Sequence, residues 1–325
     1  MPHYNRNESF KIKKRKYKPK TLDTSFTLKD SKDYGIVVET KYNQAHILYN
    51  NKIVKASLNN NKQKLNQIIF PGDKVTLSQI NSAYTITNLL DRTSLLSRVK
   101  TDRTRNTKTT KNIAANIDLA VIVVSAKEPP LHPNFIDRYL IILKNSNIDY
   151  IICLNKCELK TEKEEQILDI YKKINIKVIE TSTIKNIGID HLKQHLKNKQ
   201  AILLGHSGVG KSSLLNSIMN YNKTKTSKIS QKTKKGRHTT TSSKYYIWDK
   251  NSSIIDTPGI RSLDTSFIRK EDIKEFFPEF NNTKCKYKNC THHHEPLETC
   301  MVKQKVKDGN INKQRYESYI KLLEN

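Results

Sequence analysis

The feature that most constrains this sequence is a glycine-rich segment at residues 205–213, which reads GHSGVGKSS. It follows a short apolar run at residues 201–204, precedes a helix-like run at 214–219, and matches the pattern G-x-x-x-x-G-K-[ST]. In such a loop, backbone N–H groups surround phosphates, the lysine contacts the β and γ phosphates, and the next hydroxyl binds Mg²⁺. The sequence therefore predicts an α/β domain with a nucleoside triphosphate site, with Lys211 in a catalytic role and Ser212 as a Mg²⁺ ligand.

A second motif, Asp256-Thr-Pro-Gly259, ends an apolar run downstream of this loop. At this distance from a phosphate loop, D-x-x-G is typical of triphosphate hydrolysis, with Asp256 near Mg²⁺ and the Gly259 N–H near the γ phosphate. Between the two motifs, residues 236–241 read GRHTTT at the end of a lysine-rich segment that could order around the γ phosphate. We expect one of its threonines, Thr239 or Thr240, to be the second Mg²⁺ ligand.

Two elements that precede the glycine-rich segment are interpreted as base-reading motifs. Residues 154–158, LNKCE, resemble the guanine-reading N-K-x-D element of GTPases, and residues 180–183, ETST, resemble its supporting loop. A carboxylate at this position accepts hydrogen bonds from guanine N1–H and the 2-amino group, which adenine cannot match. Glu158 stands where Asp is usual, so an enzyme that also accepts ATP stays an alternative. The predicted nucleotide-binding residues are Asn155, Lys156, Glu158, Ser182, Thr183, Gly205, His206, Ser207, Gly208, Val209, Gly210, Lys211, Ser212, Ser213 and Gly259.

The N-terminal part of the chain has a different texture. Short β-rich runs separated by Asn-rich and Pro-Gly turns occur at residues 34–39, 44–49, 52–58, 73–77 and 83–87. Their number and length predict a small β-barrel of the oligonucleotide-binding (OB) type. The alternative is a barrel that serves only as a spacer, because this fold has many roles.

The C-terminal part carries a cluster of metal-ligand residue types. Cys285, Cys290, His292 and Cys300 supply three thiolates and one imidazole, a closed set that suits one structural Zn²⁺. Residues 297–299 lie between the Glu-Pro pair and the last cysteine, so His294 stays an alternative fourth ligand. Cys153 and Cys157 are interpreted as inert thiols.

The order of these motifs is unusual, because the base-reading elements precede the phosphate loop whereas an ordinary GTPase has them last. This order predicts a circularly permuted GTPase domain. With the barrel, the GRHTTT and DTPG motifs and the Cys/His tail, the chain resembles the ribosome small subunit-dependent GTPase A family of bacteria. The resemblance extends from about Tyr34 to the C-terminal helix.

The resemblance implies a GTPase that binds the nearly mature 30S subunit and its 16S rRNA, is stimulated by it, and hydrolyses GTP during late assembly. It also suggests that His238 orients the attacking water, since Ile260 follows D-x-x-G where many GTPases carry Gln. The alternative is that His238 only packs in this segment or contacts RNA. Other functions left open are an NTPase that acts on another RNA and an inactive RNA-binding scaffold.

Composition is consistent with a polyanionic partner. Lys and Arg number 59 against 31 Asp and Glu, a formal net charge of +28, which excludes an acidic nucleic-acid mimic. Part of this charge could instead reflect an AT-rich genome, since Asn and Ile are also abundant. We find no apolar stretch of the roughly 20 residues that a membrane helix needs, and no signal-peptide segment. We therefore expect a cytoplasmic monomer with no membrane partner.

The expected organisation has four parts, with a polar linker near residues 101–112. They are a basic disordered arm at residues 1–20, an OB-fold RNA-binding domain at 21–106, a circularly permuted α/β P-loop GTPase domain at 107–280, and a zinc-binding helical domain at 281–325.

Overall fold

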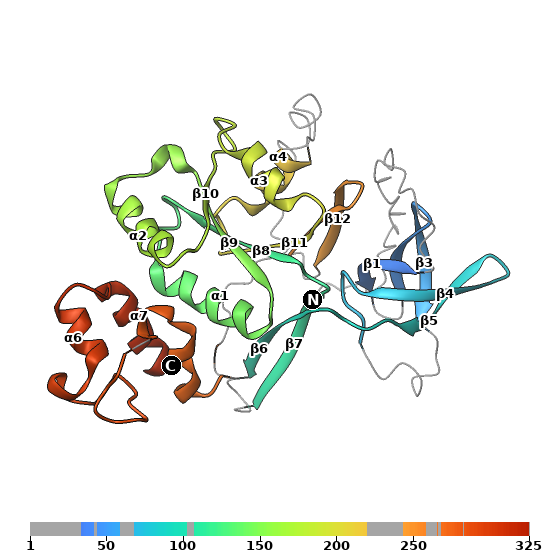
Figure 1. Cartoon of the computed structure of the whole chain (residues 1–325). Helices are drawn as coiled ribbons and strands as arrows, with labels where there is room; N and C mark the ends of the chain where they lie inside the picture. Colours follow the sequence, from blue (N-terminus) through green and yellow to red (C-terminus); the bar gives the residue numbers. More distant parts are fainter. Residues whose placement is uncertain are drawn as a thin grey trace, which may run out of the picture.

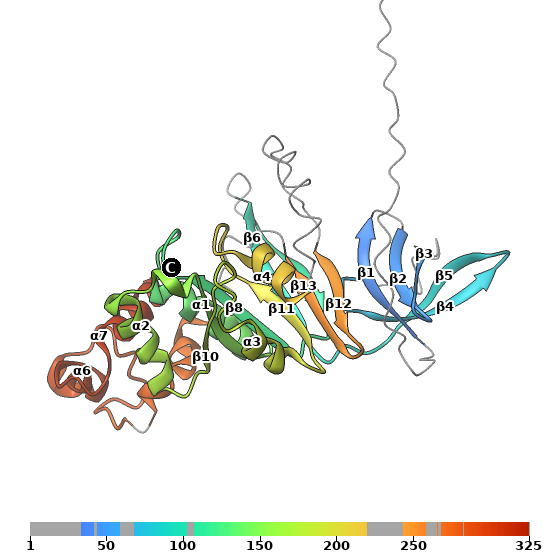
Figure 2. The same ribbon diagram turned by 90° about the horizontal axis from the view of Figure 1, so that it is seen from above.

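The structure is a computed structural model that describes residues 34–41, 44–58, 68–102, 107–219, 243–257, 265, 268–281 and 283–324. The predicted basic arm at residues 1–20 lies outside this range. A β-barrel and a helical C-terminal segment lie on opposite sides of a central sheet in both views (Figures 1 and 2). No helix in the described ranges is both long enough and apolar enough to span a membrane.

Five strands form the N-terminal barrel, which closes in the order β1-β2-β3-β5-β4. They are β1 (Gly35–Lys41), β2 (Gln44–Tyr49), β3 (Lys52–Leu58), β4 (Lys74–Ile80) and β5 (Ala83–Leu89). Alternate residues point inward, so that Val37, Ala45, Ile47 and Ile86 are buried in one cluster. The predicted β-barrel is confirmed.

A long hairpin connects the barrel to the central sheet. Strand β6 (Leu95–Asp102) pairs antiparallel with β7 (Thr107–Ala115) over almost its whole length. The prediction of a polar linker at residues 101–112 is therefore wrong. This stretch is polar but rich in threonine, whose branched side chain favours extended backbone. The boundary predicted after residue 106 separates the two strands of this hairpin.

The central sheet has six strands in the order β10-β9-β8-β11-β13-β12. They are β8 (Leu119–Ser125), β9 (Asp149–Asn155), β10 (Val178–Glu180), β11 (Gln200–Leu204), β12 (Lys244–Asp249) and β13 (Ser252–Asp256). All neighbours pair parallel except β12, which is antiparallel to β13. Strand β8 is buried at every position, as expected for an apolar strand inside a parallel sheet. The α/β class is confirmed.

Helices cover both faces of this sheet. Helices α1 (Pro133–Asn145) and α2 (Glu162–Lys173) contribute to one buried cluster, and α3 (Ile189–Leu196) and α4 (Lys211–Ile218) contribute to the other. A capping box at Thr161 and Glu164 fixes the start of α2. The two clusters bury the sheet, so the carboxyl ends of its parallel strands are rigidly placed.

The C-terminal segment consists of short helical turns and two helices. They are the 3₁₀ turns η3 (Lys270–Phe276), η4 (Pro278–Phe280) and η5 (Leu297–Thr299), followed by α6 (Met301–Lys307) and α7 (Lys313–Glu324). Phe277, Phe280 and Tyr319 form part of its core, and Ile141 of α1 belongs to the same cluster. The segment therefore packs directly on the central domain through α1 (Figure 1).

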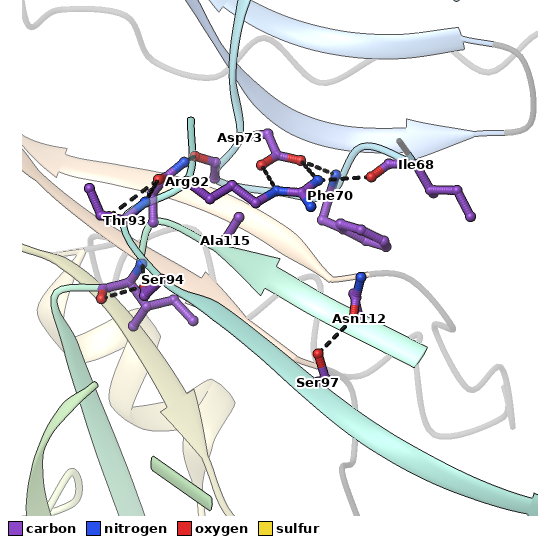
Figure 3. Close-up of polar contacts among 12 residues, drawn as sticks. Ile68, Phe70, Asp73, Arg92, Thr93, Ser94, Ser97, Asn112 and Ala115 are labelled. Carbon is purple, nitrogen blue, oxygen red and sulfur yellow. Dashed lines mark hydrogen bonds and ion pairs between the residues drawn. The ribbon is translucent and has the colours of Figure 1, made fainter. Parts of the chain in front are cut away.

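Where the barrel meets the central domain, a buried ion pair joins the chain before β4 to the chain after β5 (Figure 3). Arg92 donates from Nε to Oδ1 of Asp73 at 2.7 Å and from Nη2 to Oδ2 at 2.9 Å. The Asp73 side chain is completely buried. Nearby, Asn116 donates to the Gly72 carbonyl at 2.9 Å. This hydrogen bond joins the chain just before β4 to the chain just before β8. The junction is therefore a bonded contact and not a free hinge.

Candidate nucleotide site and metal centre

The glycine-rich loop lies between β11 and α4, in the strand, loop and helix arrangement that the sequence predicts. Gly210 is the residue before α4 and has a φ of +92°, a conformation that glycine adopts at little cost. A Cβ atom at this position would lie 2.2 Å from Nδ2 of Asn155. The loop therefore needs glycine here both for its backbone and for the close approach of Asn155.

Lys211 is held inside this loop. Its Nζ donates to the carbonyl oxygens of Gly205 and His206, each at 2.8 Å. Burial lowers the pKa of Lys211 from its ordinary value, and the nearby Asp256 carboxylate opposes that shift. The two carbonyl oxygens thus hold the ammonium inside the glycine-rich loop.

Asp256 ends β13, opposite Leu203 of β11. Burial raises its pKa from the ordinary value, while the charges of Lys211 and Lys244 act in the other direction. The hydroxyl of Thr257, the next residue, donates to the Leu203 carbonyl at 3.1 Å. This bond fixes the strand end and with it the position of the carboxylate beside the loop. The sequence analysis did not predict that Lys244, on β12, lies close enough to influence Asp256.

The predicted base-reading element is hydrogen-bonded to the glycine-rich loop. Asn155 is the last residue of β9 and is almost completely buried. Its Nδ2 donates to the Val209 carbonyl at 2.9 Å, and its Oδ1 accepts from Thr181 Oγ1 at 3.3 Å. One side chain therefore connects the ends of β9, β10 and β11.

The other residues predicted to read the base follow β9 and β10. Lys156 adopts a left-handed backbone conformation, and its Nζ donates to the Glu128 carbonyl at 2.7 Å. Glu158 lies in the 3₁₀ turn η1 (Cys157–Leu159), where its Oε2 is buried without a hydrogen-bond partner in the described part of the chain. Ser182 is buried after β10 and Thr183 is half-buried beside it. A buried carboxylate oxygen without a partner is available to accept a hydrogen bond from an N–H group of a ligand.

Several predicted residues lie outside the described residues. These are His238, Thr239, Thr240, Gly259 and Ile260. Ser212 and Ser213 are exposed in the first turn of α4. Their roles stay predictions.

Two residues of α1 that touch the phosphate loop were missed in the sequence. The ring of Phe135 stacks on His206, with ring centroids 3.9 Å apart and an angle of 27° between the planes. The Tyr139 hydroxyl hydrogen-bonds the main chain of Gly205. No local pattern signals these contacts, because the partners are far apart in the sequence.

The four predicted zinc ligands converge in the C-terminal segment. The ligand atoms of Cys285, Cys290, His292 and Cys300 all lie within 4.8 Å of one another. Nδ1 of His292 is 3.6 Å from the sulfur of Cys285 and 3.5 Å from that of Cys300. Three sulfurs and one nitrogen in a closed group are the donor set of structural zinc.

The other candidate ligand and the other cysteines lie apart from this group. The His294 ring rests against that of His293, with centroids 3.9 Å apart, and His294 is not among the four converging residues. Cys153 is buried in the central domain, where burial raises the pKa of its thiol to about 12. A thiol with that pKa stays protonated at neutral pH, which agrees with its interpretation as inert.

Comparison with known proteins identifies the family. The family model described as RsgA GTPase matches residues 89–266. The small ribosomal subunit biogenesis GTPase RsgA of Clostridium perfringens (strain 13 / Type A) is 36% identical over 256 residues, which cover 78% of this chain and 84% of that protein. The protein of the same name from Thermotoga neapolitana is 35% identical over 260 residues, which cover 78% of this chain and 83% of its own.

Solved structures agree with this result. YjeQ from Thermotoga maritima aligns with a TM-score of 0.70 and 29% identity, covering 90% of this chain and 97% of its own. YloQ, described as a circularly permuted GTPase, aligns with a TM-score of 0.65 and 25% identity, covering 89% of this chain and 93% of its own. The predicted permutation and the predicted GTPase activity are confirmed. The chain therefore belongs to the RsgA GTPase family.

Proposed function

We propose that this GTPase binds the 30S ribosomal subunit through 16S rRNA, is stimulated by it, and hydrolyses GTP during late maturation of that subunit. The observation that carries the proposal is the bond between Asn155 and Val209, which joins a base-reading element to a phosphate loop at one edge of the sheet. The relatives named above are small-subunit biogenesis GTPases, which supports the choice of partner.

GTP fits the predicted site at the carboxyl ends of the strands better than ATP does. The buried Oε2 of Glu158 has no hydrogen-bond partner among the described residues, and it is an acceptor that guanine N1–H and the 2-amino group can satisfy. Asn155, Lys156, Ser182 and Thr183 would surround the base, and residues 205–213 would hold the phosphates of GTP or GDP. Adenine has no donor pair for the carboxylate, so ATP would bind more weakly.

The residues present fit a magnesium ion. Ser212 and Asp256 offer a hydroxyl and a carboxylate, the hard oxygen ligands that Mg²⁺ prefers, and Thr239 or Thr240 would add another. Mg²⁺ supplies neutralisation of the charge on the β and γ phosphates. Lys211 would hold the same phosphates in place, and His238 would orient the attacking water by accepting its hydrogen bond.

The Cys285, Cys290, His292 and Cys300 group fits one structural Zn²⁺. All four donors belong to the chain, which leaves no open position for a reacting molecule. The metal would act as a folding element of the C-terminal segment. This segment and the barrel would both contact rRNA, with lysines and arginines providing affinity that falls steeply as salt rises.

Co-sedimentation tests the proposal. The full-length chain is mixed with 30S subunits and a non-hydrolysable analogue of GTP, with GDP, or with a non-hydrolysable analogue of ATP. In this proposal the protein is a cytoplasmic monomer. We expect it to bind 30S subunits most strongly in the presence of the GTP analogue. Equal binding with the ATP analogue would indicate a different nucleotide, and binding that ignores the nucleotide would indicate an RNA-binding scaffold.

A further inference from the structure

Helix α1 presents two different faces to two functional parts of the molecule. Phe135 and Tyr139 are four residues apart and share one face, whereas Asn134, Asp137 and Ile141 share another. The first face contacts the phosphate loop and the second contacts the C-terminal segment. In the ribbon view, α1 lies between the central sheet and the C-terminal segment (Figure 1).

The contacts with the phosphate loop involve its first two residues. The Phe135 ring covers the His206 ring in a stacked arrangement, at 3.9 Å between centroids. The Tyr139 hydroxyl hydrogen-bonds the main chain of Gly205. These are the same two residues whose carbonyl oxygens hold the Lys211 ammonium at 2.8 Å. A shift of α1 would therefore move the carbonyls that orient this lysine.

The contacts with the C-terminal segment centre on Arg315 of α7. Arg315 is almost completely buried and makes ion pairs with Asp137 of α1 and with Glu279 of η4. Tyr171 donates to Asp137 at 2.9 Å, so the carboxylate is also tied to α2. Close by, Asn134 donates to the Ser318 hydroxyl at 3.3 Å. A buried guanidinium between two carboxylates fixes the position of α7 against α1, because separating them would leave charges buried without partners.

We propose that Phe135 and Tyr139 position the phosphate loop for nucleotide, and that α1 couples this loop to the C-terminal segment through Arg315. The C-terminal segment, which includes the four candidate zinc ligands, then influences nucleotide affinity without touching the nucleotide. The barrel is bonded instead near Asn116 and the start of β8, away from the carboxyl ends of the strands where the loop lies. The proposal rests on the nucleotide site proposed above.

The first experiment measures GDP affinity of the full-length chain by fluorescence titration. We expect Phe135→Leu to weaken GDP binding by about threefold to tenfold, the effect of losing one aromatic pair. Phe70→Leu is the matched control, since it removes another half-buried phenylalanine ring, in the barrel, and should leave the affinity unchanged. An unchanged affinity in Phe135→Leu would overturn the positioning role.

Lys211→Ala separates this proposal from the site on which it rests. If Lys211→Ala loses GDP binding while Phe135→Leu does not, the nucleotide site stands and the role of α1 is wrong. If Lys211→Ala binds GDP as the wild type does, the proposed nucleotide site itself is wrong.

The second experiment tests the coupling through Arg315. Arg315→Lys keeps a positive charge beside Asp137, but an ammonium cannot make the same forked contacts with two carboxylates. We expect it to weaken GDP binding, and the effects of Arg315→Lys and Phe135→Leu to be non-additive in the double variant. Fold-changes that simply multiply would show that the two residues act independently and would overturn the coupling.

A spectroscopic readout distinguishes coupling from a loss of stability. The ring protons of His206 lie in the ring-current field of Phe135, so their NMR shifts report the stacked geometry. They should move in Arg315→Lys even though Phe135 is intact, and an unmoved signal would contradict the coupling. If Arg315→Lys does not fold, Asn134→Ala replaces it, because this variant removes the contact with Ser318 and leaves no buried charge.

Discussion

Asn155 and Val209 are joined by a hydrogen bond of 2.9 Å from a side-chain amide to a main-chain carbonyl. Asn155 ends β9, and Val209 lies in the phosphate loop after β11, with β8 between the two strands in the sheet. The part of the site that would hold the base is therefore directly bonded to the part that would hold the phosphates. A substitution in either part will disturb the other.

The first prediction concerns this bond. Asn155→Asp replaces an N–H donor with a carboxylate oxygen that faces the Val209 carbonyl, so an attraction becomes a repulsion. We expect GTP affinity to fall by about tenfold or more, in line with a lost buried hydrogen bond. Isothermal titration calorimetry provides the measurement. Ser97→Ala is the control, because it removes a side-chain hydrogen bond to Asn112 in the hairpin, remote from the site (Figure 3), and should leave the affinity unchanged.

The second prediction compares two glycines with similar backbone conformations. Gly210 and Gly309 have φ values of +92° and +75°, but a Cβ atom would meet Asn155 at the first and nothing within 4 Å at the second. We expect Gly309→Ala to cost about 1 kcal/mol of stability, the backbone penalty alone, and to retain GTP binding. Gly210→Ala should lose GTP binding. Equal effects of both substitutions on binding would show that the close approach to Asn155 does not matter.

The third prediction concerns the ion pair between Asp73 and Arg92. Arg92→Ala leaves the completely buried Asp73 carboxylate without its partner, which we expect to cost about 3 kcal/mol in the free energy of unfolding. Arg269→Ala removes a similar forked pair with Asp272, but the Arg269 side chain is 72% exposed, so we expect a much smaller loss of stability than in Arg92→Ala. Chemical denaturation measures both variants. Similar losses would mean that burial does not decide the strength of the Asp73 pair.

The fourth prediction identifies the ligands of the C-terminal metal site. Cys300→Ser should lose bound zinc and unfold the C-terminal segment, because metal binding in small sites contributes folding free energy directly. His294→Ala should retain one equivalent of zinc, since His294 lies outside the converging group. Atomic emission spectroscopy of the purified variants gives the zinc content. If Cys300→Ser keeps its zinc and His294→Ala loses it, then His294 and not Cys300 is the fourth ligand.

Much of the fold could be predicted because strong local patterns decided it. The apolar run that became β8 is buried at every position, and the amphipathic pattern at residues 135–144 lies within α1. The hairpin of β6 and β7 was missed because residues 100–112 include no apolar residue in the sequence, and buried residues such as Leu96 and Ile113 occur only near its base, so no hydrophobic alternation marks the strands. Strand pairing between such segments is decided by backbone bonds that composition does not reveal.

The residues of the candidate site also fall into two groups, those that a local motif predicts and those that it does not. Residues defined by motif, such as Lys211 and Asn155, lie together as the sequence predicts, because each follows or precedes a strand of one parallel sheet. Phe135 and Arg315 carry no motif, and their importance comes from partners distant in the sequence. Contacts of this kind follow from tertiary packing and could not be predicted from local pattern.

The most direct test of the proposed function is the rate of GTP hydrolysis by the full-length chain alone, with purified 30S subunits, and with 50S subunits. The proposed function predicts slow hydrolysis by the chain alone and by the chain with 50S subunits, and a strong increase with 30S subunits that disappears in Lys211→Ala and in His238→Ala. A rate that 30S subunits leave unchanged while 50S subunits raise it would contradict the proposed function.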